Sequence, residues 1–368
     1  MPGKILGLDI SKDHITAVQV TSGLKTYQIT ACCRVPFDDN EGMEEALQAL
    51  SQQMDLKNDT CIASIPEGDV SFRNLQLPFK ARKKIRQTLP FEIETVVPFP
   101  IEDLIIDFNV TDSSDRNDIL AVSVRKAYIS EYLAKLQTFG LDPDVLDIRS
   151  FPTVSWLLEQ DGIPDNGLFL EIGLKRNSMV LFLNRRIAMI RSSVPDNGVS
   201  IQSISDDGKE EYSDSMAAEQ IESCLTSFCA CIKNTLHSFG WHRNSATYPE
   251  KIFYTGVGTL YPRTAELLNR FLDLPGEHIN ISRDRRVSMG IDIARTWKPA
   301  LMDSALALAL RDGRKGRGFN LRKDGFEVTR HYLGLKKNIR KMAISLILIL
   351  LFIAADLGLD YHLLKKRY

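Results

Sequence analysis

A strand–turn–strand pattern occurs twice in this chain and constrains its fold more than any other feature. Residues 5–20 read ILGLDISKDHITAVQV, and residues 168–183 read LFLEIGLKRNSMVLFL. Each copy has two short apolar runs separated by a polar turn, which is typical of buried strands joined in a hairpin. An acidic residue, Asp9 or Glu171, ends the first strand of each copy. One copy alone indicates only an ordinary hairpin, but the repeat predicts two related half-domains that face one cleft.

A glycine-containing element follows the two copies. Residues 251–274 predict a strand, a turn with Gly256 and Gly258, and an amphipathic helix. Turn N–H groups beside an acidic residue are suited to hold phosphate and a metal ion. The series of three elements resembles the two phosphate loops and the adenosine loop of the actin-like ATPase superfamily. Within that superfamily, the chain resembles the PilM/GspL family of type IV pilus assembly and type II secretion proteins.

The resemblance covers about residues 4–322 and includes the stretches 88–110 and 141–158. It implies an α/β chain with the actin-like ATPase fold, in which two RNase H-like half-domains carry an inserted α/β subdomain. The expected division of the chain is a first half-domain at 1–160 with the insertion at about 70–148, a second half-domain at 161–312, a basic juxtamembrane linker at 313–341 and a transmembrane helix at 342–364.

The cleft positions that the resemblance implies depart from the family's pattern. They are Asp9, Ser11, Glu171, Gly173, Gly256 and Gly258. The family usually has Asp-x-Gly in both phosphate loops and three consecutive glycines in the adenosine loop. Here Ser11 adds a Cβ where the backbone approaches phosphate, Glu171 moves its carboxylate by one methylene, and Val257 places a branched side chain beside the base or ribose. We therefore expect no catalytic residue, no enzyme activity and no required cofactor, while weak ATP binding stays open.

An uncharged apolar run near the C-terminus is the second informative feature. Residues 342–355 contain no charged side chain, and extension to residue 364 gives the roughly 20 residues that a membrane-spanning helix needs. The alternative is a buried core helix, but the run is apolar on every face. Eleven Lys and Arg residues between 311 and 341 precede it. The positive-inside rule then predicts a single-pass protein with a large cytoplasmic N-terminal domain, and the resemblance implies that the membrane is the inner membrane.

Charge and cysteine content exclude two classes of site. The 46 Lys and Arg residues nearly balance the 47 Asp and Glu residues, so no global basic field favours a nucleic-acid partner. Cys224, Cys229 and Cys231 fall on a predicted helix without the CxxC or paired-His spacing of a metal site. We expect free thiols and no bound metal.

The basic stretch before the apolar run contains a short apolar segment, Phe319, Asn320 and Leu321. It resembles the Asn-Leu peptide that PilN, the membrane partner of PilM, lays into a groove on PilM; GspL proteins carry a similar segment in the same chain. We hypothesise that these three residues dock on this chain's own cytoplasmic domain. The alternative is a flexible basic linker.

Two functions remain open. The first is a non-enzymatic scaffold of a type II secretion or type IV pilus machine, for which the resemblance implies a cytoplasmic assembly ATPase, a bitopic GspM- or PilO-like membrane protein and a second copy of this chain as partners. The second is a membrane-anchored ATP-using enzyme. Residues 175–177, Lys-Arg-Asn, supply no carboxylate base beside the second loop, which favours the scaffold.

Overall fold

The computed structural model describes residues 3–37, 42–79, 81–112, 117–173, 175–195, 215–243, 248–311 and 318–328. Contacts group Met1–Lys323 into one compact unit, which carries every helix and strand named below. Asp324–Tyr368 form a second unit, of which residues 324–328 are described. The predicted transmembrane segment, residues 342–364, lies outside the described residues. Among the helices that are described, none combines the length and the hydropathy that a membrane crossing requires.

The first repeat lies in a six-stranded sheet with the order β14-β3-β2-β1-β4-β8. Its first three strands along the chain pair in antiparallel order. They are β1 (Gly3–Ile10), β2 (His14–Ser22) and β3 (Tyr27–Pro36). The strands β4 (Thr60–Ile65) and β8 (Val145–Ile148) then add in parallel at one side. Helix α1 (Gly42–Gln53) follows β3 and buries Met43, Ala46, Leu47 and Leu50. Their spacing of three, one and three residues places them on one helix face.

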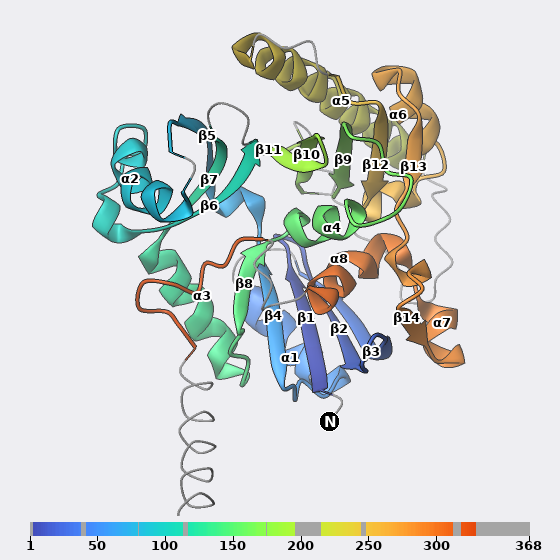
Figure 1. Cartoon of the computed structure of the whole chain (residues 1–368). Coiled ribbons are helices and arrows are strands. Elements are labelled where there is room, and N and C mark those ends of the chain that lie inside the picture. The colour runs from blue at the N-terminus through green and yellow to red at the C-terminus, as the bar shows by residue number, and fades with distance from the viewer. Residues whose placement is uncertain are drawn as a thin grey trace, which may run out of the picture. The chain divides into compact units, whose positions relative to one another are not determined.

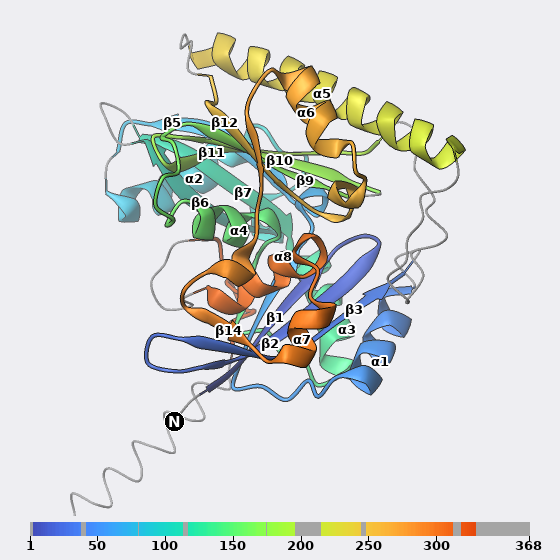
Figure 2. The same ribbon diagram turned by 90° about the vertical axis from the view of Figure 1, so that its right-hand side faces the viewer.

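The second repeat lies in a five-stranded sheet with the order β11-β10-β9-β12-β13. Its strands are β9 (Gly167–Ile172), β10 (Asn177–Leu183), β11 (Arg186–Ser193), β12 (Lys251–Thr255) and β13 (Gly276–His278). Helices α5 (Ser215–Arg243) and α6 (Thr264–Leu272) share one apolar core with this sheet (Figures 1 and 2). Both repeats are therefore antiparallel hairpins, as the alternation of apolar runs predicts.

The inserted unit is a three-stranded sheet of order β5-β7-β6. It comprises β5 (Ser71–Leu77), β6 (Leu104–Asp112) and β7 (Asn117–Arg125), with α2 (Arg82–Glu94) packed on it through its own apolar core. Helix α3 (Lys126–Thr138) leads back to β8, which pairs with β4 of the six-stranded sheet. The insertion is therefore shorter than the predicted range of about 70–148.

The chain returns to the first half after β13, which corrects the predicted second half-domain at 161–312. Strand β14 (Val287–Met289) pairs with β3, α7 (Ile291–Thr296) follows it, and α8 (Pro299–Leu310) packs against β1 and β2. A Cβ at Gly7 would overlap the backbone oxygen of Ala305, so α8 lies in direct backbone contact with β1. Together with α4 (Ser150–Leu157), α8 lies between the two larger sheets (Figures 1 and 2).

Candidate functional site

The first repeat ends its first strand at a buried carboxylate. Asp9 is 1% exposed at the end of β1, and its Oδ1 accepts a hydrogen bond of 2.9 Å from the Ser64 hydroxyl. The turn that follows is closed by a hydrogen bond from the Ser11 N–H to the His14 carbonyl, 2.9 Å long. The Ser11 hydroxyl donates to Asp13 at 2.8 Å. The Ser11 side chain therefore hydrogen-bonds within the turn itself.

The second and third loops meet at the end of β9. Glu171 is 2% exposed, and the Gly173 N–H beyond it donates to the Asn177 side chain at 3.1 Å. Gly256 has φ of 99°, and a Cβ there would lie 2.5 Å from the Ile172 carbonyl oxygen. Gly258 also faces Ile172 too closely for a side chain. These two glycines let the third loop pack directly on the second repeat.

Arg149 joins the two repeats. It lies between β8 and α4, is 7% exposed, and its Nε donates to both Asp9 oxygens at 3.0 and 3.1 Å. One terminal nitrogen lies 2.7 Å from Glu171 Oε1, which also accepts a 3.2 Å hydrogen bond from Ser304. We call the site around Asp9, Arg149 and Glu171 the cleft. The guanidinium therefore lies between the carboxylates that the two repeats supply.

The contacts of His14 beside Arg149 determine which of its ring nitrogens carries the proton. Its Nε2 lies 3.2 Å from an Arg149 terminal nitrogen, which can only donate, so Nε2 accepts and the ring proton is on Nδ1. Nδ1 then donates to Asp13 at 2.6 Å. Burial lowers the pKa of His14, against the opposing charge of Asp13, and this favours the same neutral ring.

The acidic residues of the cleft share one buried cation, Arg149. Burial alone lowers the pKa of Arg149, but Asp9 and Glu171 more than offset it, so the guanidinium stays charged. Burial raises the pKa of the Glu171 carboxyl, against the opposing Arg149 charge. Glu67, 2% exposed, accepts a hydrogen bond of 2.9 Å from the Ser150 N–H at the start of α4. An anionic phosphate at this place would meet four buried acidic residues, Asp9, Asp13, Glu67 and Glu171, against one buried cation.

The described residues contain no group of three His, Cys, Asp or Glu side chains arranged to hold a metal ion. In the cleft, most of the carboxylate oxygens of Asp9 and Glu171 already contact other side chains. The Asp9 oxygens are taken by Arg149 and Ser64, and the bound oxygen of Glu171 is taken by Arg149 and Ser304. Glu171 Oε2 is the buried acceptor that has no partner among these residues. A single free oxygen does not fit Mg²⁺, which requires near-octahedral oxygen ligation.

A second site lies at the free side of β8, and we call it the groove. Phe319 and Leu321 are each 0% exposed, and the Phe319 ring packs edge-on against Phe151 of α4 with ring centroids 4.9 Å apart. The Leu321 N–H donates to the Leu146 carbonyl of β8 at 2.8 Å. Burial of two large apolar side chains stabilises this arrangement by about 3–6 kcal/mol before ordering costs.

Polar contacts fix the register of the segment in the groove. The Phe319 N–H donates to Asp147 at 3.2 Å, and the Asn320 N–H donates to Asp107 of β6 at 3.0 Å. The Asn320 side-chain oxygen accepts from the Leu146 N–H at 3.3 Å and from the Arg322 N–H at 3.0 Å. The Asn320 side chain therefore pairs with the free edge of β8 and also closes a turn within its own segment.

Arg311 anchors the start of the same segment. Its Nε lies 2.9 Å from Asp147, and a terminal nitrogen donates to the Phe319 carbonyl at 2.8 Å. Burial raises the pKa of Asp147 to about 6, against the opposing Arg311 charge. Further along, Arg322 pairs with Asp142 at 2.7 Å and Lys323 with Asp107 at 2.6 Å. The cations that follow Asn320 thus meet carboxylates on the groove's rim.

The structure brings all nine predicted site residues into two places. Asp9, Ser11, Glu171, Gly173, Gly256 and Gly258 lie around the cleft, and Phe319, Asn320 and Leu321 lie in the groove. Sequence reasoning missed the charged residues that organise both places, namely Arg149, Glu67, Asp147, Asp107 and Arg311. One signal was available, because Asp147 and Arg149 interrupt the apolar run VLDIRSF of residues 145–151. Charges in such a run are seldom buried without partners.

Comparison with known proteins gives a consistent family. The profile described as "Type IV pilus assembly protein PilM" matches residues 7–191, which is half of the 368-residue chain. The type II secretion system protein L of Dickeya chrysanthemi is 31% identical over 90 residues, covering 24% of this chain. The aligned stretch spans only 22% of that relative's length.

The chain is also similar to solved structures. A PilM-PilN type IV pilus biogenesis complex matches with a TM-score of 0.68 at 21% identity, over 83% of this chain and 98% of that one. The cytoplasmic domain of EpsL, an inner membrane component of the type II secretion system of Vibrio cholerae, matches with a TM-score of 0.47 at 12% identity, over 88% and 100%. A Bacteroides thetaiotaomicron protein with an actin-like ATPase fold gives 0.46 at 9% identity, over 84% and 96%. The first of these matches shows that the chain shares the fold of the PilM-PilN structure.

Proposed function

The chain belongs to the PilM family of type IV pilus assembly proteins, and on that premise we propose that it is a non-catalytic scaffold. As a scaffold, it couples the cytoplasmic assembly ATPase of a type II secretion or type IV pilus machine to membrane and periplasmic components. The likeness to both the pilus protein and the secretion protein supports a component of this class. The choice between the two machines is left to experiment.

The observation that carries the proposal is Arg149. Its guanidinium lies 3.0 Å from Asp9 and 2.7 Å from Glu171, so the acidic groups of both repeats already have a cation. Phosphoryl transfer depends on metal ions and cations that neutralise developing charge, and on a residue that orients the nucleophile. With its carboxylates engaged internally, the cleft fits a structural joint between half-domains better than a site of hydrolysis.

The alternative function is a membrane-anchored nucleotide-binding protein or ATPase of actin-like fold. The fold is the only feature that favours this alternative. A fold alone is weak support, because one fold hosts many unrelated functions. ATP at this site is a weak ligand at most and is not required for the scaffold.

The groove supports the scaffold in a different way. The solved relative is a complex of PilM with PilN, and in the present chain residues 319–321 fill a groove on the chain's own first half. We infer that this segment ties the domain to the predicted membrane helix at 342–364, placing the domain on the cytoplasmic side of the inner membrane. A bitopic GspM- or PilO-like protein and a second copy of this chain are then its membrane neighbours, and the assembly ATPase binds on the cytoplasmic side.

The test separates scaffold from ATPase with one variant set in the full chain. Combining Asp9→Asn, Arg149→Met and Glu171→Gln removes the cation together with the two carboxylates that it contacts. A strain that lacks the native protein is supplied with this variant, and secretion or piliation is measured. The scaffold predicts near-normal function and unchanged co-purification of the assembly ATPase. Loss of function in a variant whose thermal unfolding is unchanged would favour the ATPase.

A further inference from the structure

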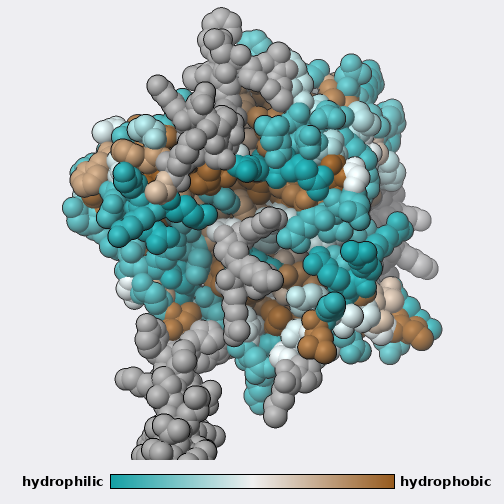
Figure 3. Space-filling view, in the orientation of Figure 1, coloured by the Kyte–Doolittle hydropathy of each residue, from teal (hydrophilic) through white to brown (hydrophobic). Residues whose placement is uncertain are grey.

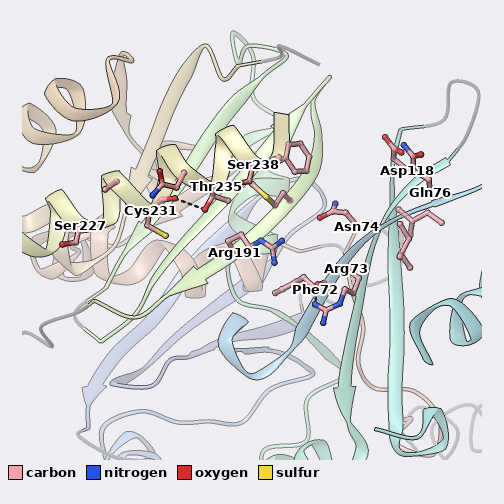
Figure 4. Close-up of a pocket in the computed structure, with 16 residues that line it drawn as sticks. Phe72, Arg73, Asn74, Gln76, Asp118, Arg191, Ser227, Cys231, Thr235 and Ser238 are labelled. Atoms are coloured by element: carbon pink, nitrogen blue, oxygen red, sulfur yellow. Dashed lines mark hydrogen bonds between the residues drawn. The ribbon is translucent and has the colours of Figure 1, made fainter. Parts of the chain in front are cut away.

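A cavity of about 1000 Å³ lies between the inserted sheet and the second half, apart from both the cleft and the groove. One wall is β5, and the opposite walls are β11 and the exposed side of α5 (Figure 4). Apolar surface gathers in the hollow between the inserted sheet and the five-stranded sheet (Figure 3).

The β5 wall has the form of an open strand edge. Five consecutive residues, Phe72 to Gln76, line the cavity. If the cavity faced one side of the strand, only alternate residues would line it, because side chains alternate between faces. Strand β5 pairs with β7 and ends the three-stranded sheet, so its other row of N–H and C=O groups faces the cavity.

The α5 wall leaves room for a chain along that edge. Ser227, Ala230, Cys231, Asn234 and Ser238 form one row along the helix, and all five are exposed. The opposite row, including Phe228 and Ile232, is buried against the sheet. The exposed row spans about 16 Å at 1.5 Å per residue. A five-residue strand spans about the same length at 3.3 Å per residue.

Charge and hydrogen bonding at the cavity select the kind of occupant. Arg73 and Arg191 both line it, and Asp118 is the one acidic residue of the lining. The Arg73 guanidinium donates to the Phe72 and Val96 carbonyls at 2.8 and 3.3 Å. Arg191 and Asn74 extend toward each other from opposite walls, and Asn74 donates to the Ala188 carbonyl at 2.6 Å (Figure 4). The Arg191 guanidinium therefore favours an occupant with an acidic side chain.

We propose that this cavity is a docking site for an extended acidic segment of a partner protein, which adds to β5 as a further strand. The backbone of about five partner residues bonds to the open edge, a carboxylate meets Arg191, and the small side chains of α5 accommodate the outward-facing side chains. Strand addition derives affinity from main-chain hydrogen bonds and specificity from the pockets for alternate side chains. The surface is separate from the cleft, so it does not depend on whether ATP binds.

Random seven-residue peptides displayed on phage and selected on the full chain provide the probe. We expect recovered peptides with β-branched residues and an acidic residue at alternate positions. Their dissociation constants are then measured by fluorescence anisotropy with synthetic copies. Arg191→Glu and Ala230→Trp should each weaken binding at least tenfold, the first by charge and the second by filling the cavity. Arg86→Glu, at an exposed arginine of α2 outside the cavity, is the matched control and should leave affinity unchanged.

A second readout uses Cys231, which lies exposed in the cavity wall. Bound peptide should slow its alkylation by iodoacetamide at least fivefold, while Cys32 on β3 reacts at an unchanged rate. The proposal is overturned if selection yields no binder or if the binders ignore both cavity variants. It is also overturned if peptides bind only after residues 196–214 are deleted, which would assign the cavity to this chain's own acidic stretch, or if Ala230→Trp abolishes self-association, which would assign it to a second copy.

Discussion

The cleft and the groove are both organised by a buried arginine and a buried carboxylate, yet they differ in what the arginine holds. In the cleft, Arg149 joins Asp9 and Glu171, which are parts of the two repeats themselves. In the groove, Arg311 joins Asp147 and also holds the carbonyl of Phe319, a residue of a separate segment. The cleft is therefore completed by its own half-domains, whereas the groove is completed by a peptide.

The comparison separates a site whose residues pair with one another from a site that holds an extended segment. In the cleft, Asp9 and Glu171 both contact Arg149, and we propose that the site therefore gains little from binding a nucleotide. A groove that offers the free side of β8 and two carboxylates still needs an extended partner, which residues 319–321 provide. The following variants test this difference, starting with the largest expected effect.

Arg149→Ala should be the most damaging change. It leaves Asp9 and Glu171 buried without their cation, and breaking a buried ion pair from one side costs about 3–5 kcal/mol. Urea unfolding of the full chain measures the loss of free energy, and Arg86→Ala on exposed α2 is the control, with an expected change within about 0.5 kcal/mol. A change below about 1 kcal/mol for Arg149→Ala would show that the cleft does not depend on this charge.

Phe319→Ala should detach the segment without unfolding the domain. Removal of a fully buried ring costs about 3–5 kcal/mol when the site cannot collapse. The expected consequence is hydrogen exchange at the Asn320 and Leu321 amides that is roughly a hundredfold faster or more, since 1.4 kcal/mol is tenfold. Phe91→Ala removes an exposed ring, 64% accessible, and is the matched control. Equal exchange in both variants would mean that the ring does not hold the segment.

Asp147 should give the groove a pH dependence. Its folded pKa of about 6 lies above the ordinary value of 3.8, so the folded state favours the neutral acid. Its stabilising contribution is therefore complete below about pH 4 and is lost as the pH rises through 6, by about 2–3 kcal/mol. Asp147→Asn does not titrate, so the unfolding free energy of the native chain should fall relative to this variant between pH 4 and 7. A constant difference would contradict the assignment.

Lys323→Ala should have the smallest effect. Its ammonium lies 2.6 Å from Asp107, but the side chain is 30% exposed, and such pairs contribute about 0–1 kcal/mol. Exchange at the Leu321 amide should rise less than about fivefold, and the difference should shrink at high salt. A rise in Leu321 amide exchange as large as that in Phe319→Ala would show that charge, rather than apolar burial, holds the segment.

Local patterns predicted the elements of this fold better than its long-range assembly. The alternating apolar runs at 5–20 and 168–183 predict both hairpins because side-chain alternation is a local property. The return of α8 to β1 follows from the fit of Gly7 against Ala305, which no local signal reveals. It places residues 287–310 on the first half, against the predicted division.

The candidate sites show the same limit. Asp9 and Glu171 stand out because each ends a strand of the repeat, but Arg149 is 140 positions away from Asp9 along the chain. Its role depends on β8 lying beside β4, a pairing that sequence spacing does not specify. The segment at 319–321 was suggested by resemblance alone, and its carboxylate partners Asp107 and Asp147 come from two different sheets.

We propose that the cleft is closed by its own charges and has lost the ATPase reaction. Calorimetric titration of the full chain with Mg-ATP, run beside a phosphate-release assay, tests it most directly. We expect weak or undetectable heat of binding and phosphate release equal to the protein-free blank. Tight binding with phosphate release that disappears in Asp9→Asn would contradict it.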